Sequence, residues 1–465
     1  MIGLLVVSWA CFTYCFPSRR YVTVFLLLFL ATAGFQLPPI ELMTMPQMGL
    51  TKSYDWIIIF LLFALVVHPS SLFNREKWRA FRYINILFLF LLLLIFYSVW
   101  AQHVELPVAL RVFRNYMFII LVYIFCELDD KDMKKVFRLV TYFTALASVI
   151  YCLQLVAGRS LLNNLLDDYS TLDLQINNGL ARYYNIPILG TPVFFLLLAD
   201  KSVVNRKLKW ILLLPVFGAI LLSQHRNLLL AIIACCLIYY IIQNNIGILK
   251  VLLVSLVSAG VLLGINTITD NRFGEGASDL TDLFKNGVTE NDIRMADLNL
   301  LSTSEFRFYH FYERTSYVLQ TPSRAIFGIG LLSEDSHAVK DLHFNIGLPS
   351  DTKDVTQVDT GDIVWSLLVM HFGLMGTLLF ILLYTNLLRR MYRTRNDPKM
   401  MAAFLFVLNL LFISFYGMVI IIPPVICLTM LFAAYLYRCE QRAPITGGHF
   451  LRESSKYPTT ANAAH

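Results

Sequence analysis

Residues 83–102 read YINILFLFLLLLIFYSVWAQ and contain no Asp, Glu, Lys or Arg. A helix needs about 20 mostly apolar residues to cross about 30 Å of hydrocarbon, and this stretch has that length. Residues 251–266 and 362–388 are also apolar and are long enough, or nearly long enough, to cross. These segments predict helices that span a membrane.

The composition of the chain agrees with this prediction. Hydrophobic residues make up 57% of the chain and charged residues 15%, and the mean hydropathy is +0.63. Soluble domains usually carry about 25% charged residues, so the composition indicates a polytopic membrane protein. Residues 2–16 precede Arg19, Arg20 and another apolar run without a small-residue cleavage site, which predicts a retained helix and not a signal peptide.

The predicted fold is an all-α integral membrane protein with about 12–13 transmembrane helices. We divide the chain into an N-terminal helix bundle (1–267), an extracytoplasmic loop (268–361), C-terminal transmembrane helices (362–437) and a disordered cytoplasmic tail (438–465). The spans are predicted near residues 2–16, 22–35, 55–68, 83–102, 110–127, 137–157, 184–199, 208–224, 227–243, 250–267, 362–388, 401–417 and 419–437.

The distribution of Lys and Arg predicts the orientation of the chain. Of its 38 Lys and Arg residues, 24 lie in one set of alternate connectors, at residues 19–20, 75–82, 131–138, 201–209, 250, 389–399 and 438–456. The opposite short connectors and adjoining helix ends hold only Lys52, Arg111, Arg114, Arg159, Arg182 and Arg226. Because cytoplasmic loops are enriched in Lys and Arg, the long loop is predicted to be extracytoplasmic. The net charge of +7 therefore reflects topology and does not indicate nucleic acid as a partner.

The long loop is the part of the chain in which we expect chemistry. Between Asp270 and Thr360 it holds 15 Asp and Glu against 8 Lys and Arg. A transporter rarely needs such a loop, whereas an enzyme that works at a membrane surface often does. All eight cysteines lie in the predicted spans or at their ends, and no spacing indicates a zinc site. Neither a metal nor a cofactor is expected.

Two shorter outer connectors also carry candidate residues. Residues 159–185 are predicted to form a short amphipathic interfacial helix, with Arg182 near its end. Residues 223–227 form a tight turn between two apolar helices and contain His225 and Arg226. An arginine near the membrane is costly unless it is paired or faces water, so we favour a functional role for Arg226 over a snorkelling anchor.

An aromatic helix is predicted within the long loop, over residues 302–320. Arg307 and Arg314 share one face of this helix because they are seven residues apart. Arginine forks match phosphate oxygens, so both are candidate ligands of a diphosphate, although Arg314 could equally pair with local carboxylates. Residues 321–322 end the helix, and Phe327-Gly328-Ile329-Gly330 is predicted to be a flexible turn.

The remaining candidates are acid–base groups and one further arginine. Arg114 either points into the same vestibule or snorkels at the start of its helix. His337 and His343 of the loop, together with Asp359 and Asp362 at its return to the membrane, could accept a proton as general base. Asp359 and Asp362 could instead simply cap the next helix, because a carboxylate stabilises a helix N-terminus.

Several of these stretches resemble the superfamily of O-antigen ligases and O-antigen polymerases. Ser223-Gln224-His225-Arg226 is similar to its Ser-Arg step at the outer end of a helix. Ser304-Glu305-Phe306-Arg307, followed by Pro322 and the Gly328-Ile329-Gly330 step, resembles its long-loop pattern. Residues 359–362, followed by Phe372-Gly373-Leu374-Met375-Gly376, resemble its return to the membrane.

The resemblance implies a GT-C-like membrane glycosyltransferase that works without a metal in the bacterial inner membrane. Its donor would be an undecaprenyl-diphosphate-linked oligosaccharide, its active site would face the periplasm, and its C-terminus would be cytoplasmic. Carried onto this chain, Arg226 and Arg307 would hold the diphosphate with help from Arg182. Expected partners are membrane lipids, a glycan or lipid A-core acceptor and a chain-length regulator.

One departure from the family pattern favours a polymerase over a ligase. Ligases carry a His-Asn pair about eleven residues before the glycine that corresponds to Gly373, and this chain has Asp362-Ile363 there. The alternatives are an O-antigen ligase, a lipid-linked oligosaccharide flippase and a cell-wall glycosyltransferase of the shape-and-division type. A flippase would show repeated halves and short outer loops, which this sequence does not show.

Overall fold

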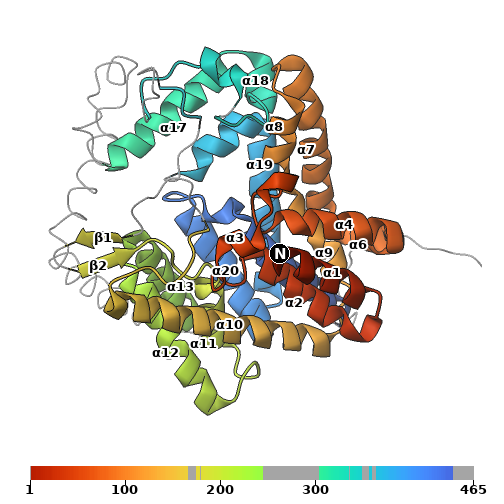
Figure 1. Ribbon diagram of the computed structural model, residues 1–465, viewed down its shortest axis with the longest axis vertical. Helices are drawn as coiled ribbons and strands as arrows, with labels where there is room; N and C mark the ends of the chain where they lie inside the picture. Colours follow the sequence, from red (N-terminus) through yellow and green to blue (C-terminus); the bar gives the residue numbers. More distant parts are fainter. Residues whose placement is uncertain are drawn as a thin grey trace, which may run out of the picture.

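The computed structural model describes residues 2–165, 174–177, 180–244, 303–334, 336–347, 355–358 and 363–442, with only the backbone for 174–177, 180–182 and 303–304. The secondary-structure elements of these residues are helices apart from one short hairpin (Figure 1). The N-terminal elements are α1 Ile2–Tyr14, η1 Pro17–Arg19, α2 Arg20–Ala31, α3 Ile40–Met43, η2 Pro46–Met48, α4 Asp55–Val67, α5 Pro69–Leu72, α6 Arg75–Ala80, α7 Arg82–Ala101, α8 Leu106–Arg114, η3 Met117–Ile120, α9 Leu121–Phe125 and α10 Asp130–Ala157.

The middle and C-terminal elements complete the described chain. In the middle lie β1 Leu174–Asn177, β2 Leu180–Tyr183, α11 Gly190–Ala199, α12 Arg206–Leu222 and α13 Arg226–Asn244. After a gap follow α17 Thr303–Leu319, α18 Pro322–Phe327, η4 His337–Asp341, α19 Val364–Arg393, α20 Pro398–Ile413, η5 Val419–Ile421 and α21 Pro423–Arg442.

Four described helices are long and apolar enough to cross a membrane, namely α7, α10, α13 and α19. Two bent pairs raise the number to six if each pair is one span: α4 with Pro69–Ala80, bent by 106°, and α8 with Met117–Phe125, bent by 48°. A membrane protein is therefore supported, whereas the total of 12–13 spans remains a prediction. The predicted span at 250–267 lies outside the described residues.

The span predicted near residues 110–127 is bent, because α8 and Met117–Phe125 form one of the two pairs that can each count as one span. The chain bends after Arg114, where polar side chains anchor the turn to the neighbouring helix. The Arg114 guanidinium lies 2.9 Å from the Asp55 carboxylate, and the Tyr54 hydroxyl donates to Asn115 Oδ1 at 3.3 Å. Burying an arginine requires such a partner. Apolar packing alone would have favoured a straight helix.

The prediction of an interfacial helix over residues 159–185 is wrong. Within it, β1 and β2 pair antiparallel, with Gln175 opposite Arg182 and Asn177 opposite Leu180. The two sequence positions between the strands are Asn178-Gly179, the dipeptide most typical of a two-residue hairpin. This local signal outweighs the weak helical periodicity of the surrounding residues.

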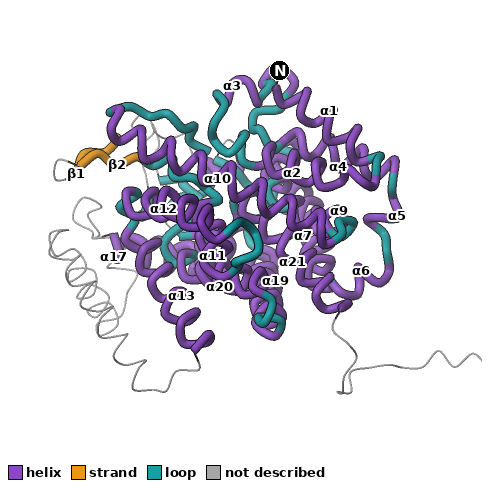
Figure 2. Tube along the Cα trace, turned by 90° about the horizontal axis from the view of Figure 1, so that it is seen from below, coloured by secondary structure: helices purple, strands orange, loops and turns teal. Residues whose placement is uncertain are grey.

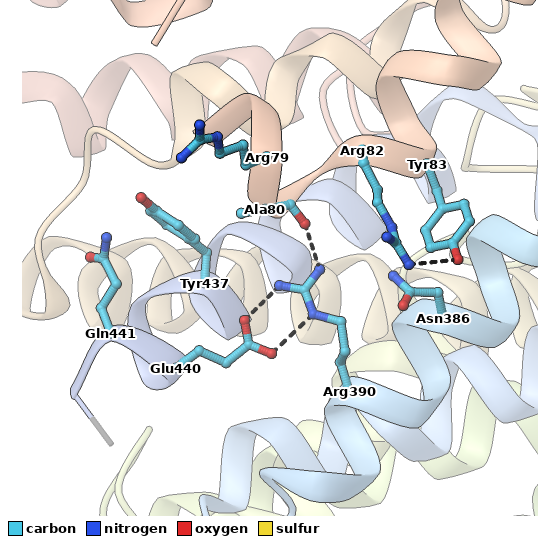
Figure 3. A pocket seen from close by; sticks show the side chains of 9 residues that line it. All are labelled: Arg79, Ala80, Arg82, Tyr83, Asn386, Arg390, Tyr437, Glu440 and Gln441. Carbon is cyan, nitrogen blue, oxygen red and sulfur yellow. Dashed lines mark hydrogen bonds and ion pairs between the residues drawn. The ribbon is translucent and has the colours of Figure 1, made fainter. Parts of the chain in front are cut away.

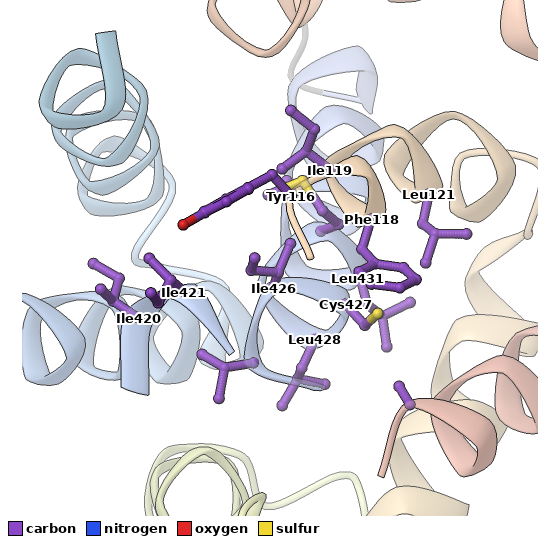
Figure 4. Packing of buried hydrophobic residues seen from close by; sticks show 14 of the residues in the cluster. Tyr116, Phe118, Ile119, Leu121, Ile420, Ile421, Ile426, Cys427, Leu428 and Leu431 are labelled. Carbon is purple, nitrogen blue, oxygen red and sulfur yellow. The ribbon is translucent and has the colours of Figure 1, made fainter. Parts of the chain in front are cut away.

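The C-terminal helices are packed among the N-terminal ones. Helix α19 lies along α7, α20 contacts α11 and α13, and α21 contacts α9 and η3 (Figure 2). Phe118 of η3 and Leu431 of α21 are fully buried in this contact (Figure 4). Since lipid is as apolar as these side chains, close packing is what holds such helices together. Residues 362–437 therefore do not stand apart as a separate bundle.

Many of the basic residues predicted to share one side of the membrane gather at one end of the helix bundle. Arg20 and Lys77 both pair with Glu127, and Arg390 pairs with Glu440. The same end holds the ion pairs Lys399–Asp200 and Arg442–Asp130. We call this the basic end. Because α21 continues to Arg442, the predicted tail boundary at 437 is wrong: residues 438–442 are helical and held by charge pairs.

Candidate functional site

The turn between α12 and α13 places an arginine at a helix N-terminus. Gln224 has a φ of +54°, which lets the chain reverse between Leu222 and Arg226. The buried Ser223 hydroxyl donates to the Ile220 carbonyl at 2.6 Å and accepts the His225 amide at 3.4 Å. A cation is disfavoured in the first turn of a helix, where the backbone already carries partial positive charge. An anion bound at this turn would be stabilised by both the helix N-terminus and Arg226.

The hairpin lies directly beside this turn. The ring of Tyr184, which follows β2, meets the His225 imidazole edge to face, with 6.3 Å between centroids. The Tyr183 carbonyl accepts a hydrogen bond of 2.9 Å from Tyr151 of α10, which anchors the end of the strand. Arg182 lies in β2, two residues before Tyr184.

Helix α17 supplies the next arginine. The Arg307 guanidinium lies over the ring of Tyr416, 5.5 Å from its centroid. Tyr416 follows the end of α20, where neighbouring Phe415 packs against Trp365 of α19. Arg307 therefore approaches the C-terminal end of α20.

Helix directions bring this arginine to the same end of the bundle as Arg226. Lys399 at the start of α20 pairs with Asp200 at the end of α11, 2.7 Å apart, and Lys209 near the start of α12 donates to the Leu198 carbonyl. Helix α12 therefore runs away from the basic end, and α13 runs back toward it. The contact of Cys235 Sγ with the Leu405 carbonyl shows that α13 lies alongside α20. The start of α13 and the end of α20 consequently lie together, opposite the basic end.

Glycines fasten α18 to α19 in a close crossing. Gly328 has φ +72° and ψ −158°, and Gly373, inside α19, has φ +61° and ψ −168°. A Cβ on Gly373 would lie 2.4 Å from the Ile326 carbonyl oxygen and 2.5 Å from the Gly328 nitrogen. The Ile329 amide donates to the Met370 carbonyl at 2.7 Å. The turn at 327–330 was predicted to be flexible, and that prediction is wrong because backbone contacts pack it tightly.

Helix α7 contributes to the same crossing. The Ser98 hydroxyl accepts the Leu331 amide at 2.8 Å, and the Tyr97 hydroxyl donates to the Gly328 carbonyl at 3.2 Å. The two stretches that resemble the family pattern, at 328–330 and around Gly373, therefore meet in space. Their contact fixes how α17 and α18 sit on the membrane helices.

Arg314 is buried in the loop and does not face a ligand site. Its side chain is 0% exposed and lies 2.7 Å from the Glu313 carboxylate. Its Nη2 donates to the carbonyls of Ile346 and Gln357 at 2.8 and 2.6 Å, and the guanidinium covers the Phe344 ring. Arg314 thus ties two loop segments to α17, and we remove it from the proposed diphosphate ligands.

His310 is a second buried polar group on α17. Its Nδ1 lies 3.1 Å from the Ser366 hydroxyl of α19, and its ring is fully buried. Burial, with a smaller contribution from Arg314, lowers the pKa of His310 to about 3. The imidazole is therefore neutral at physiological pH and joins α17 to α19.

The loop histidines His337 and His343 occupy exposed positions. The His337 amide donates to Glu105 at 3.1 Å, beside the Ser336 hydroxyl, which donates to the same carboxylate at 2.5 Å. The hydrogen bond from Ser336, followed by backbone amides, lowers the pKa of Glu105 to about 2. His343 Nδ1 lies 3.3 Å from the Asp341 carbonyl. No described contact joins either imidazole to Arg226 or Arg307.

Of the remaining predicted site residues, Arg114 lies within the described part of the chain. Arg114 belongs to the ion pair with Asp55 that anchors the bend after α8. Asp359 and Asp362 lie outside the described residues. Within the part of the chain that the structure describes, no group of three His, Cys, Asp or Glu residues could hold a metal ion. All eight cysteines are free thiols.

Comparison with known proteins adds no family to this description. No protein-family model matches the chain, and no curated protein matches its sequence.

Four features of the structure were missed in the sequence: Tyr416, Ser366, Glu105 and the hairpin. Tyr416 and Ser366 carry no local signal, because their roles depend on which helix packs against them. Glu105 lies in a connector three residues after the apolar run, and only the fold brings Ser336 to it. The hairpin had a readable signal in Asn178-Gly179.

Proposed function

We propose that this protein transfers glycan from a polyprenyl-diphosphate-linked donor, at the end of the bundle opposite the basic end. The observation that carries the proposal is that Arg226, at the start of α13, and Arg307, over Tyr416 after the end of α20, lie at the same end of the bundle. A lipid-linked diphosphate presents several phosphate oxygens at the membrane surface, and arginine forks match them geometrically. Arg182, which lies in β2 two residues before Tyr184, is a further candidate ligand.

In the proposed reaction, an acceptor hydroxyl attacks the anomeric carbon of the donor sugar. The bond from that carbon to the diphosphate oxygen breaks, and the polyprenyl diphosphate leaves with the electron pair. Negative charge grows on the leaving group, so arginine contacts that strengthen as it departs lower the barrier. The hydroxyl proton passes to a general base, for which Asp359, Asp362, His337 and His343 are the candidates.

We favour a polymerase of surface-polysaccharide repeat units, oriented with this end toward the periplasm and the basic end in the cytoplasm. The acceptor would then be a second lipid-linked glycan, and a chain-length regulator would be an expected partner. Transfer to lipid A-core would make the protein a ligase. Because most basic connectors are predicted to be cytoplasmic, the orientation follows from the charge distribution.

Reconstitution of the purified protein in liposomes with a lipid-linked repeat unit tests the proposal, with and without lipid A-core. Extension without the core identifies a polymerase, and transfer only to the core identifies a ligase. Loss of an arginine that stabilises a developing charge is expected to slow transfer by about 10²-fold or more. We expect this loss for both Arg226→Ala and Arg307→Ala.

Arg324→Ala is the matched control, because Arg324 belongs to the same helical assembly and stacks on Tyr317 in the way that Arg307 stacks on Tyr416. The control should retain activity. Full activity of both Arg226→Ala and Arg307→Ala, with normal insertion, would refute the diphosphate clamp. Movement of the lipid-linked donor between leaflets without any new glycosidic bond would identify a flippase instead.

A further inference from the structure

A cavity of about 750 Å³ opens at the basic end, between α6, α7, α19 and α21 (Figure 3). Arg390 lies in its centre, donating to both carboxylate oxygens of Glu440 at 2.6 and 2.9 Å and to the Ala80 carbonyl at 3.0 Å. Arg79 lies to one side of Arg390 and Arg82 to the other. The cavity is therefore built around a fixed ion pair that joins three helices.

The lining of the cavity carries an excess of positive charge and of hydrogen-bond donors. Glu440 neutralises one of the three arginines, which leaves Arg79 and Arg82 in excess. Both of these side chains are exposed. The Arg82 guanidinium donates to the Tyr83 hydroxyl at 3.0 Å and covers the Tyr83 ring. Arginine forks and hydroxyls are the groups that bind phosphate oxygens, so the cavity suits a phosphate-bearing anion.

Two exposed apolar stripes begin at the cavity and run away from it. On α7, Ile86, Leu89 and Leu93 follow Arg82 at helical spacing and are 45%, 51% and 63% exposed. On α19, which lies along α7, Leu382, Leu378 and Met375 precede Asn386 at helical spacing and are 37%, 54% and 48% exposed. Each stripe covers about 10 Å, at a rise of about 1.5 Å per residue.

We propose that the cavity binds the headgroup of an anionic diacyl phospholipid whose acyl chains lie along these two stripes. Because α7 and α19 are candidate membrane spans, the stripes would face the bilayer, and a lipid whose headgroup sits in the cavity would lay its acyl chains along them, whereas a free anion would use only the charged lining. A zwitterionic lipid would place its own cation among Arg79 and Arg82. The site lies at the end opposite Arg226, so it does not depend on the proposed transferase activity.

Native mass spectrometry of the full-length protein in detergent tests this site, with dioleoyl phosphatidylglycerol and dioleoyl phosphatidylcholine as probes. A basic residue near an anionic lipid contributes about 1 kcal/mol, or about fivefold in affinity. We therefore expect Arg79→Gln with Arg82→Gln to weaken phosphatidylglycerol binding by about 25-fold and to leave phosphatidylcholine binding unchanged. Arg390 is kept, because its contacts hold the cavity together.

The control replaces Arg75 and Arg389 by Gln, two exposed arginines of α6 and α19 that do not line the cavity. This double variant should bind phosphatidylglycerol within about twofold of the unmodified protein. Equal losses in the two double variants would show that diffuse surface charge attracts the lipid and would overturn the site. So would equal binding of the two lipids. Competition by the deacylated headgroup glycerophosphoglycerol at the lipid's own concentration would assign the cavity to a free anion and overturn the lipid proposal.

Discussion

Replacing Gly373 by alanine should separate α18 from α19. The added Cβ would lie 2.4 Å from the Ile326 carbonyl oxygen and 2.5 Å from the Gly328 nitrogen. These are backbone atoms of a short helix and its cap, so they cannot rotate away as a side chain would. The φ of +61° and ψ of −168° at Gly373 also lie in a region that is almost restricted to glycine.

The expected loss of stability comes from backbone strain and from broken hydrogen bonds. Holding a side-chain-bearing residue in this conformation costs about 1–3 kcal/mol. The Cβ clash is relieved only if the helices also move apart, and the bonds from the Ile329 amide to Met370 and from the Leu331 amide to Ser98 are then lost in addition. Each contributes about 0.5–1.5 kcal/mol. Gly373→Ala should therefore lower the free energy of unfolding by about 2–6 kcal/mol.

Gly49→Ala provides the matched control. Gly49 also has a positive φ, of +76°, but no atom lies within 4 Å of the position its Cβ would take. It should cost only about 1–2 kcal/mol, the penalty for a left-handed conformation. Unfolding of both variants can be followed in the same detergent by titration with a denaturing detergent. Equal losses for Gly373→Ala and Gly49→Ala would refute the argument that the close crossing holds α18 on α19.

Three further predictions concern the loop. Arg314→Ala should lower the free energy of unfolding by about 3–5 kcal/mol, because it removes one partner of a buried ion pair, whereas Arg324→Ala should cost less than about 1 kcal/mol. The pKa of His310 is lowered to about 3, so the folded protein binds fewer protons than the unfolded chain between about pH 3 and 6.5. Its stability should fall on acidification through that window, by at most about 1.4 kcal/mol per pH unit from this group. His310→Phe should reduce that slope, and an unchanged slope in this variant would contradict the assignment. Glu105→Gln should speed hydrogen exchange of the His337 amide above pH 4.5, because the ionised Glu105 carboxylate otherwise accepts a hydrogen bond from that amide. Unchanged exchange would show that this contact does not hold η4.

Much of the helical structure could be predicted from local sequence, because length and apolar composition are local properties. Residues 83–102 correspond to α7, the aromatic stretch 302–320 to α17, and the turn at 223–227 to the junction of α12 and α13. The gathering of the basic connectors at one end also follows the predicted charge pattern. Arg226 and Arg307 remained candidates for the same reason: an arginine at a helix end beside the membrane is visible without the fold.

The tertiary structure decided which of the candidate side chains are already engaged within the fold. Arg307 and Arg314 lie on the same predicted helix face, yet Arg314 is buried against carbonyls of Ile346 and Gln357 that follow it by more than thirty residues. Gly328 and Gly373 both looked like parts of flexible or helical segments until the backbones of α18 and α19 met at them. Such contacts depend on the packing of elements that are distant in the chain, and neither hydrophobic period nor local propensity encodes that packing.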